Sequence, residues 1–291
     1  MKHSLKDWII ATRPWSFTAS AMPVIVTAAW MAANDRDVCW WLAALTVVNI
    51  ILVHAAGNTW SDYHDYVKGV DTADTYGAKT ITTGLFTANE IRHLSEILNI
   101  AAIAMGIAMV AMTGLPLLWI GIIGFALFMG YPTLKYHALG DIVIILCYSI
   151  LPMLGTSFIT TGTLYWDSLW MALPVGLITV GILHSNNTRD IETDTAADAT
   201  TLPALIGRAL SVKLYYVEVT LPYIWMITIC VAGIAPWWAL LCLLSLPLAI
   251  KNIKVMMLYK QGINAYAHVD EATAQLQLAF SVLLIIGLLI S

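Results

Sequence analysis

The chain has 291 residues, of which 59% are hydrophobic and only 11% are charged, and its mean hydropathy is +0.78. Soluble domains of this length are far more polar, so the composition excludes them. A net charge of −4, with no basic patch, also excludes a protein that binds nucleic acid. We therefore expect a polytopic membrane protein made of α-helices.

Nine apolar stretches are each long enough to cross about 30 Å of bilayer hydrocarbon as a helix. The expected spans are 15–33, 40–58, 92–113, 115–131, 140–161, 168–186, 210–232, 235–250 and 272–290. No segment has the composition of a soluble appendage or a low-complexity linker. The sequence therefore predicts an all-α fold with one transmembrane domain that covers residues 1–291.

The basic residues predict the orientation of these spans. With the N-terminus inside, Arg36 alone of the 14 Lys and Arg residues falls in an outer loop. Cytoplasmic loops of membrane proteins carry an excess of such residues. We therefore expect the N-terminus and the long loops after the second and sixth spans to be cytoplasmic.

Two similar polar motifs follow the second and the sixth span, and each has one asparagine and two aspartates. They are Asn58, Asp62 and Asp65, and Asn186, Asp190 and Asp194. On an α-helix, spacings of three and four residues place side chains on one face. Carboxylates held this close favour a bound cation, and their hard oxygen atoms suit Mg²⁺. The motifs predict an enzyme that acts on a diphosphate.

Four segments of the chain resemble the UbiA-type intramembrane prenyltransferases. The two motifs lie in NTWSDYHDYVKGVDTADT (58–75) and NNTRDIETDTAADATTL (186–202), which are similar to the two signature loops of that family. YPTLKYHALGD (131–141) and DWIIATRPWSFTASAMPVIV (7–26) resemble its menaquinone-pathway branch, the 1,4-dihydroxy-2-naphthoate polyprenyltransferases. The resemblance covers much of the chain between Arg13 and Leu202.

The resemblance implies nine helices around a central cavity, capped on the cytoplasmic side by the two aspartate-bearing loops. It implies that Mg²⁺ joins a polyprenyl diphosphate to the catalytic and metal-binding carboxylates Asp62, Asp65, Asp190 and Asp194. The acceptor implied is an aromatic quinone precursor, 1,4-dihydroxy-2-naphthoate, which would lose CO₂ and give demethylmenaquinol. The implied location is the bacterial inner membrane, with lipid as a further partner.

Physical chemistry assigns further roles in such a reaction. Basic and amide groups bind phosphate oxygens, and the candidates are Asn58, Asn186, Lys135, Arg189, Lys79 and Lys68. Aromatic rings shield an allylic cation, and the candidates are Tyr63, Tyr131, Tyr136 and Tyr148. The alternative for Lys68, Lys79, Lys135 and Arg189 is an ordinary topology signal, and the alternative for the tyrosines is ring packing.

The chain departs from the branch pattern at two places. Ser61 stands where relatives carry a second Asn. Ala199-Thr200 stands where relatives carry a basic residue, and Lys79 is a candidate to take the place of that basic residue. We expect His54 and His184 to be neutral histidines with hydrogen-bond partners, and Asp141 to fix Lys135 or a loop. Glu218, inside the seventh span, has no assigned role.

Two alternatives remain open at this point. The acceptor could be another phenol, a porphyrin-like ring or a glycerol phosphate lipid, with the same reaction class. A divalent cation transporter could also use paired carboxylates, but transporters hold acids near the middle of the membrane. The motif carboxylates cluster at one membrane face, which favours the enzyme.

Overall fold

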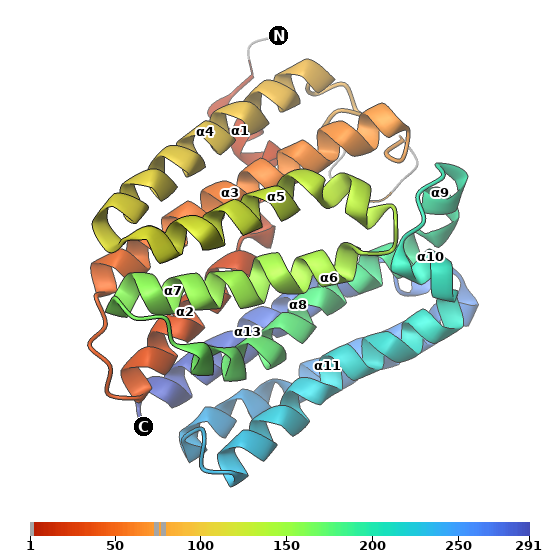
Figure 1. The fold of residues 1–291 in the computed structure, drawn as a ribbon. Helices are drawn as coiled ribbons and strands as arrows, with labels where there is room; N and C mark the ends of the chain where they lie inside the picture. The colour runs from red at the N-terminus through yellow and green to blue at the C-terminus, as the bar shows by residue number, and fades with distance from the viewer. Residues whose placement is uncertain (1–2, 73–75, 77–79) are drawn as a thin grey trace.

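The computed structural model describes residues 3–72, 76 and 80–291, and this part of the chain is helical, with no β-strand (Figure 1). Nine of its helical segments are long and apolar enough to cross a membrane, which confirms the predicted number of spans. They are Pro14–Ala33, Trp40–Lys68, Ala88–Thr113, Leu115–Lys135, Gly140–Thr161, Trp166–Arg189, Arg208–Val231, Trp237–Gln261 and Ile263–Leu289.

Several spans consist of more than one helical element. The α-helices are α1 (Leu5–Ala11), α2 (Thr18–Ala33), α3 (Trp40–Lys68), α4 (Ala88–Thr113), α5 (Leu115–Lys135), α6 (Gly140–Ile145), α7 (Leu151–Thr161), α8 (Leu169–Arg189), α9 (Ile191–Ala196), α10 (Leu202–Ile206), α11 (Arg208–Val231), α12 (Leu246–Met256) and α13 (Val269–Leu289). Short 3₁₀ turns lead into α2, α8 and α13, and a π-helical turn joins α6 to α7. The 3₁₀ element η4 (Trp237–Ser245) precedes α12.

Local sequence explains the ends of the helices that border the first motif. Helix α3 continues past the predicted end of its span at residue 58 and stops at Lys68, where Gly69 adopts φ +80°. Only glycine takes this left-handed conformation at little cost. Helix α4 begins at a capping box in which Thr87 and Glu90 satisfy each other's backbone N–H groups. The first motif is therefore helical throughout.

The packed core lies on one side of the bundle, where α13 runs between α2 and α8 and where α11 packs on α8. Large buried side chains from these four helices fill it, including Trp30, Met171, Tyr215, Met226 and Phe280. Figure 1 shows α8 and α13 in the middle of the bundle, between α11 on one side and α3 to α5 on the other. Burial of these side chains holds the second half of the chain together.

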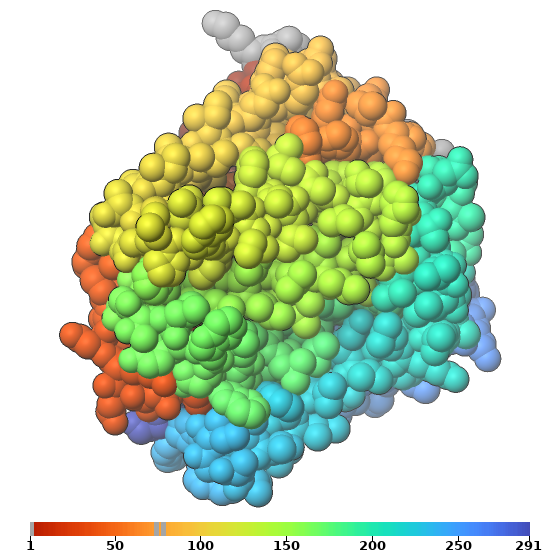
Figure 2. Space-filling view, viewed as in Figure 1, coloured from red at the N-terminus to blue at the C-terminus, as the bar shows by residue number. Residues whose placement is uncertain are grey.

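The other side of the bundle is built differently. In α4 and α5 few side chains are buried, as a lipid-facing surface requires, and Figure 2 shows these helices (yellow to yellow-green) across much of one face. Their inner side chains face a large cavity instead of a filled core. The rigid core thus supports one wall of the cavity, and a thin layer of helices closes it from the membrane.

A close backbone contact in the core gives a stability prediction. A Cβ atom on Gly287 of α13 would overlap the carbonyl of Trp238 in η4 and lie 3.0 Å from Cα of Ala239. We expect Gly287→Ala to separate η4 from α13 and to lower stability by about 1–3 kcal/mol. Gly121→Ala in α5 is the control, because nothing lies within 4 Å of its new methyl group. Thermal unfolding in detergent measures both, and equal melting temperatures would contradict the prediction.

Candidate functional site

A cavity of about 900 Å³ lies between the helices of the first half and α8. One end is polar, with side chains from both motifs, and we call it the acidic end. Most of the rest is apolar, with a wall that includes Ile107, Leu117, Phe125, Phe128 and Leu151. Residues 99–110 of α4 and residues from both ends of α5 line it, so the cavity extends along much of the length of α5. This shape suits a molecule with a charged head and a long hydrocarbon chain.

The first motif enters this cavity from the last turns of α3. Asn58, Ser61 and Asp65 line the cavity, as their helical spacing requires. The Asn58 amide donates to the Thr12 carbonyl (2.9 Å) and to Ser16 Oγ (3.0 Å). These bonds fix the asparagine to the segment that precedes α2.

Asp62 is 2% exposed and does not line the cavity. Its Oδ1 pairs with the guanidinium of Arg13, whereas its buried Oδ2 has no hydrogen-bond partner among the described residues. Arg13 lies at the cavity wall with φ +56°, a strained conformation for a residue other than glycine. The structure thus supplies a side-chain cation for this carboxylate.

Asp65 is held by groups from three positions. Lys135 Nζ at the end of α5 lies 3.3 Å from its Oδ2, and Ser61 donates to the same oxygen at 3.3 Å. The Tyr136 hydroxyl donates to Oδ1. Lys135 and Asp65 both line the cavity, so the predicted phosphate-binding lysine does lie beside the first motif.

The second motif spans the junction of α8 and α9. Asn186, Asp190 and Asp194 all line the cavity. Arg189 donates to both carboxylate oxygens of Asp190, at 2.8 and 2.7 Å, and to Oδ2 of Asp270 at 2.9 Å. Asn186 donates to the same Asp270 oxygen at 3.1 Å. An aspartate from the start of α13 therefore completes this part of the site.

Burial changes the acid strength of the groups outside the spans. It raises the pKa of the Asp194 carboxyl to about 6, against the attraction of Lys135. It also raises the pKa of Asp71 to about 6, and the nearby Asp65 adds to this effect. Burial and the Asp65 charge raise the pKa of the Tyr136 phenol. The acidic end therefore holds more negative charge than its surroundings readily stabilise, and such a site favours a cation.

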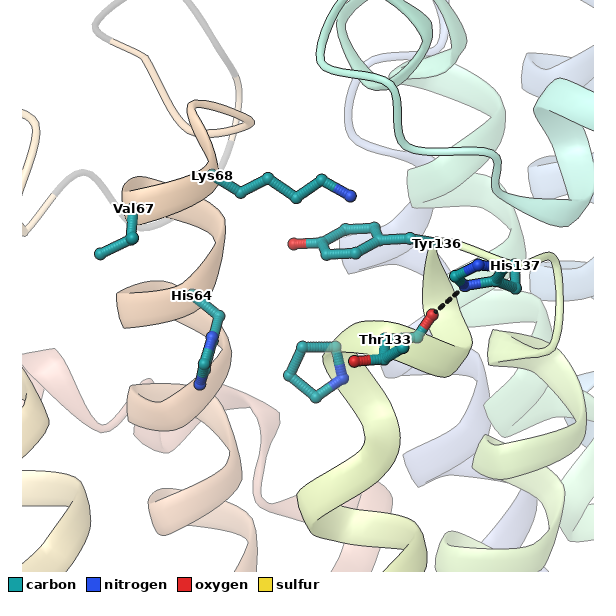
Figure 3. A pocket seen from close by; sticks show the side chains of 7 residues that line it. His64, Val67, Lys68, Thr133, Tyr136 and His137 are labelled. Atoms are coloured by element: carbon teal, nitrogen blue, oxygen red, sulfur yellow. Dashed lines mark hydrogen bonds between the residues drawn. The ribbon is translucent and has the colours of Figure 1, made fainter.

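Some predicted residues lie elsewhere. Lys68 and Tyr136 line a separate outer pocket of about 280 Å³, where the Lys68 ammonium lies 3.7 Å from the centre of the Tyr136 ring (Figure 3). Tyr63 packs beside Trp60 and His64 instead of lining the cavity. The proposed roles of these residues stay predictions, without support from their positions.

The remaining predicted residues also differ in whether they line the cavity. Tyr131 and Tyr148 do line the cavity. Arg189 does not line it but contacts three residues that do, namely Asp190, Asp270 and Tyr76. Lys79 lies outside the described residues.

Sequence reasoning missed three residues that line the acidic end, namely Arg13, Asp71 and Asp270. Arg13 marks the beginning of the resemblance and Asp71 lies within the first signature segment (58–75), but the sequence assigned neither a role. Asp270 lies 84 residues after Asn186, so no local spacing links them. The available signal for Asp270 was its position as an acidic residue at the start of an apolar span.

The two histidines have partners, as expected. His54 contacts Ser20 Oγ at 2.9 Å and Ser16 Oγ at 3.3 Å. His184 Nδ1 lies 2.7 Å from Asp141 Oδ2. Of the two expected roles of Asp141, contact with Lys135 or with a loop, the first is not observed, because Lys135 pairs with Asp65 and Asp141 joins α6 to α8 through His184.

The donor atoms at the acidic end fit a hard divalent cation. They are carboxylate oxygens together with the amides of Asn58 and Asn186, whose oxygen atoms accept no hydrogen bond from the described residues. The unpartnered Oδ2 of Asp62 also fits. The four aspartates do not form one compact cluster, however, and each is now held by protein groups. Binding of a metal would replace some of these partners.

The chain belongs to the UbiA prenyltransferase family, whose family model matches residues 21–267. It is 32% identical to the UbiA prenyltransferase domain-containing protein 1 homolog of Drosophila melanogaster over 97% of this chain and 79% of that protein. It is 30% identical to the human UbiA prenyltransferase domain-containing protein 1, over 98% and 84% of the two chains. The protein is thus an enzyme of a family that transfers prenyl groups.

Solved structures share the fold. A UbiA homolog from Aeropyrum pernix K1 superposes with a TM-score of 0.66 at 16% identity, over 94% of this chain and 97% of that one. A UbiA homolog from Archaeoglobus fulgidus bound to GPP and Mg²⁺ gives a TM-score of 0.60 at 14% identity, over 96% and 99%. At these identities the comparison establishes the multi-pass helical architecture.

Proposed function

We propose that this protein transfers a polyprenyl chain from a polyprenyl diphosphate to an aromatic quinone precursor, with Mg²⁺ as cofactor. The single observation that carries the proposal is the cavity, which receives polar side chains from both aspartate motifs at one end and is apolar beyond them. The A. fulgidus homolog with GPP and Mg²⁺ supports the donor and the metal. The acceptor we propose is 1,4-dihydroxy-2-naphthoate, from the branch resemblance.

The proposed step breaks the allylic C–O bond, and the electron pair leaves with the diphosphate. A new C–C bond forms from the ring carbon that carries the carboxylate, and loss of CO₂ returns an electron pair to the ring. Bound Mg²⁺ would supply charge neutralisation for the leaving diphosphate. Asp62, Asp65, Asp190 and Asp194 are the residues we propose to hold it.

The chain's own side chains have separate tasks in this proposal. Lys135 and Arg13 lie beside the carboxylates, where they bind phosphate oxygens once the metal takes over those carboxylates. Tyr131 and Tyr148 line the cavity and present aromatic rings to the allylic cation. The apolar wall excludes water, which would otherwise capture that cation.

We also propose that the acidic end faces the cytoplasm, as the distribution of Lys and Arg predicts. The bacterial inner membrane remains the location that we propose from the branch resemblance, although the relatives named above are animal proteins. Labelling of single cysteines from either side of sealed vesicles tests the orientation.

Product mass spectrometry tests the proposed reaction. Purified protein in detergent receives a polyprenyl diphosphate, Mg²⁺ and a panel of acceptors that includes dihydroxynaphthoate, a simple phenol, a porphyrin and a glycerol phosphate lipid. We expect the decarboxylated prenyl product of dihydroxynaphthoate, together with diphosphate. Product from another acceptor alone would correct the substrate, and divalent cation flux in liposomes without any prenylated product would replace the proposal by transport.

Removal of the metal is a further prediction. We expect EDTA to abolish product formation, and an excess of Mg²⁺ to restore it, because the diphosphate leaves poorly without charge neutralisation. The assay is diphosphate release with and without chelator. Full turnover in EDTA would exclude a dissociable metal from the mechanism.

A further inference from the structure

A second group of ionisable side chains lies inside the bundle, apart from the cavity. Asp141 in the first turn of α6, His184 on α8 and Glu218 on α11 are 8%, 0% and 3% exposed. None of the three lines the cavity of about 900 Å³. The proposed prenyl transfer therefore makes no use of them.

The three side chains converge closely. His184 Nδ1 lies 2.7 Å from Asp141 Oδ2 and 3.6 Å from Glu218 Oε1. Among the described residues, this is the one set of three or more His, Cys, Asp or Glu side chains whose ligand atoms all lie within 4.8 Å of one another. Three helices that are far apart in the sequence thus bring one nitrogen and two carboxylate ligands to a single point.

Two carboxylate oxygens of this group have no hydrogen-bond partner in the part of the chain that the structure describes. Oδ1 of Asp141 and Oε2 of Glu218 are both buried, and neither receives a donor from those residues. A methyl group on Gly181 would lie 3.6 Å from the Glu218 oxygen, so the backbone of α8 already approaches it closely. Unpaired carboxylates are costly inside a membrane protein, and they indicate a missing ligand.

Charge and donor chemistry identify that ligand as a divalent cation. Two carboxylates with a neutral imidazole carry a charge of −2, which one divalent ion would neutralise. Imidazole together with carboxylates suits zinc and related transition metals better than Mg²⁺. The other ring nitrogen, Nε2, lies 2.8 Å from Ser211 Oγ and 3.1 Å from the Ser211 carbonyl. A backbone acceptor in this position is typical for a metal-binding histidine, because it orients the ring.

We propose that Asp141, His184 and Glu218 bind one divalent transition-metal ion, with zinc as the preferred metal. The ion would join α6, α8 and α11. Since α8 also carries Asn186 and is capped by Asp190, the site would hold in place the helix that presents the first part of the second motif. This site is distinct from the acidic end, and the proposal does not depend on prenyl transfer.

Metal analysis of the full-length protein tests this site. The protein is purified in detergent, stripped with EDTA and dialysed against Zn²⁺ or Co²⁺ with Mg²⁺ in large excess, so that hard-oxygen sites hold Mg²⁺. We expect one zinc ion per chain and, with Co²⁺, visible absorption bands from a site with a nitrogen ligand. Wild-type protein that retains no zinc would overturn the proposal and would indicate that protons neutralise the cluster.

Substitutions locate the bound ion. Glu218→Gln keeps the side-chain volume and should lower zinc affinity at least about tenfold, as should His184→Gln. Glu271→Gln, on the exposed surface of α13, is the matched control and should keep the ion. Asp190→Asn should also keep it, since Asp190 belongs to the other site. Zinc that survives Glu218→Gln unchanged would overturn the assignment, and so would its loss in Asp190→Asn.

Discussion

Replacement of Asp190 by asparagine should lower the rate of prenyl transfer at least about a hundredfold, since catalytic groups that stabilise developing charge contribute effects of this size. Asp190 lines the acidic end, and both of its carboxylate oxygens accept bonds from Arg189. Asparagine keeps the shape but removes the negative charge that a metal requires. Diphosphate release at saturating Mg²⁺ measures the effect.

The control for this prediction is Asp37→Asn, an exposed aspartate near the beginning of α3. It should leave the rate unchanged. Circular dichroism and gel filtration verify that both variants are folded. If Asp190→Asn retained full activity in a folded protein, Asp190 would be removed from the proposed metal site.

Replacement of Arg189 by methionine should cause the largest loss of stability among the site variants. The side chain is 4% exposed and joins Asp190, Asp270 and the Ala267 carbonyl. Its removal leaves two partly buried carboxylates without their cation, which costs about 3 kcal/mol. Thermal unfolding in detergent measures the loss.

Arg92→Met provides the comparison. Arg92 pairs with Glu96 on the exposed surface of α4, and such pairs contribute about 0–1 kcal/mol. A double variant, Arg189→Met with Asp270→Asn, should recover part of the stability, because one unpaired charge is removed. Equal melting temperatures for Arg189→Met and Arg92→Met would show that the buried pair contributes little.

The spans were predictable from the sequence because hydrocarbon thickness sets a minimum apolar length. All nine were placed correctly, but polar residues hid the true end of α3, which continues helically to Lys68. Helix propensity and Gly69 determine where α3 ends, and a hydropathy profile contains neither of these signals. Predicted span ends were therefore less accurate than the number of spans.

The site was only partly predictable. Spacing within each motif selected Asn58, Asp65, Asn186, Asp190 and Asp194, and all of these line one cavity. Contacts between distant segments were not predictable, because one sequence carries no signal that Arg13 pairs with Asp62 or that Asp270 pairs with Arg189. Helical spacing also gave no sign that Ser61 lines the cavity whereas Asp62 does not.

The central claim is that both aspartate motifs bind one Mg²⁺-loaded diphosphate, and titration calorimetry with a geranyl diphosphate analogue tests it most directly. The analogue carries sulfur in place of the bridging oxygen, so that binding is measured without turnover. We predict binding to the wild type only with Mg²⁺, and a loss of at least about tenfold in affinity for Asp65→Asn and for Asp190→Asn separately. Binding without Mg²⁺, or unchanged affinity in either variant, would contradict the claim.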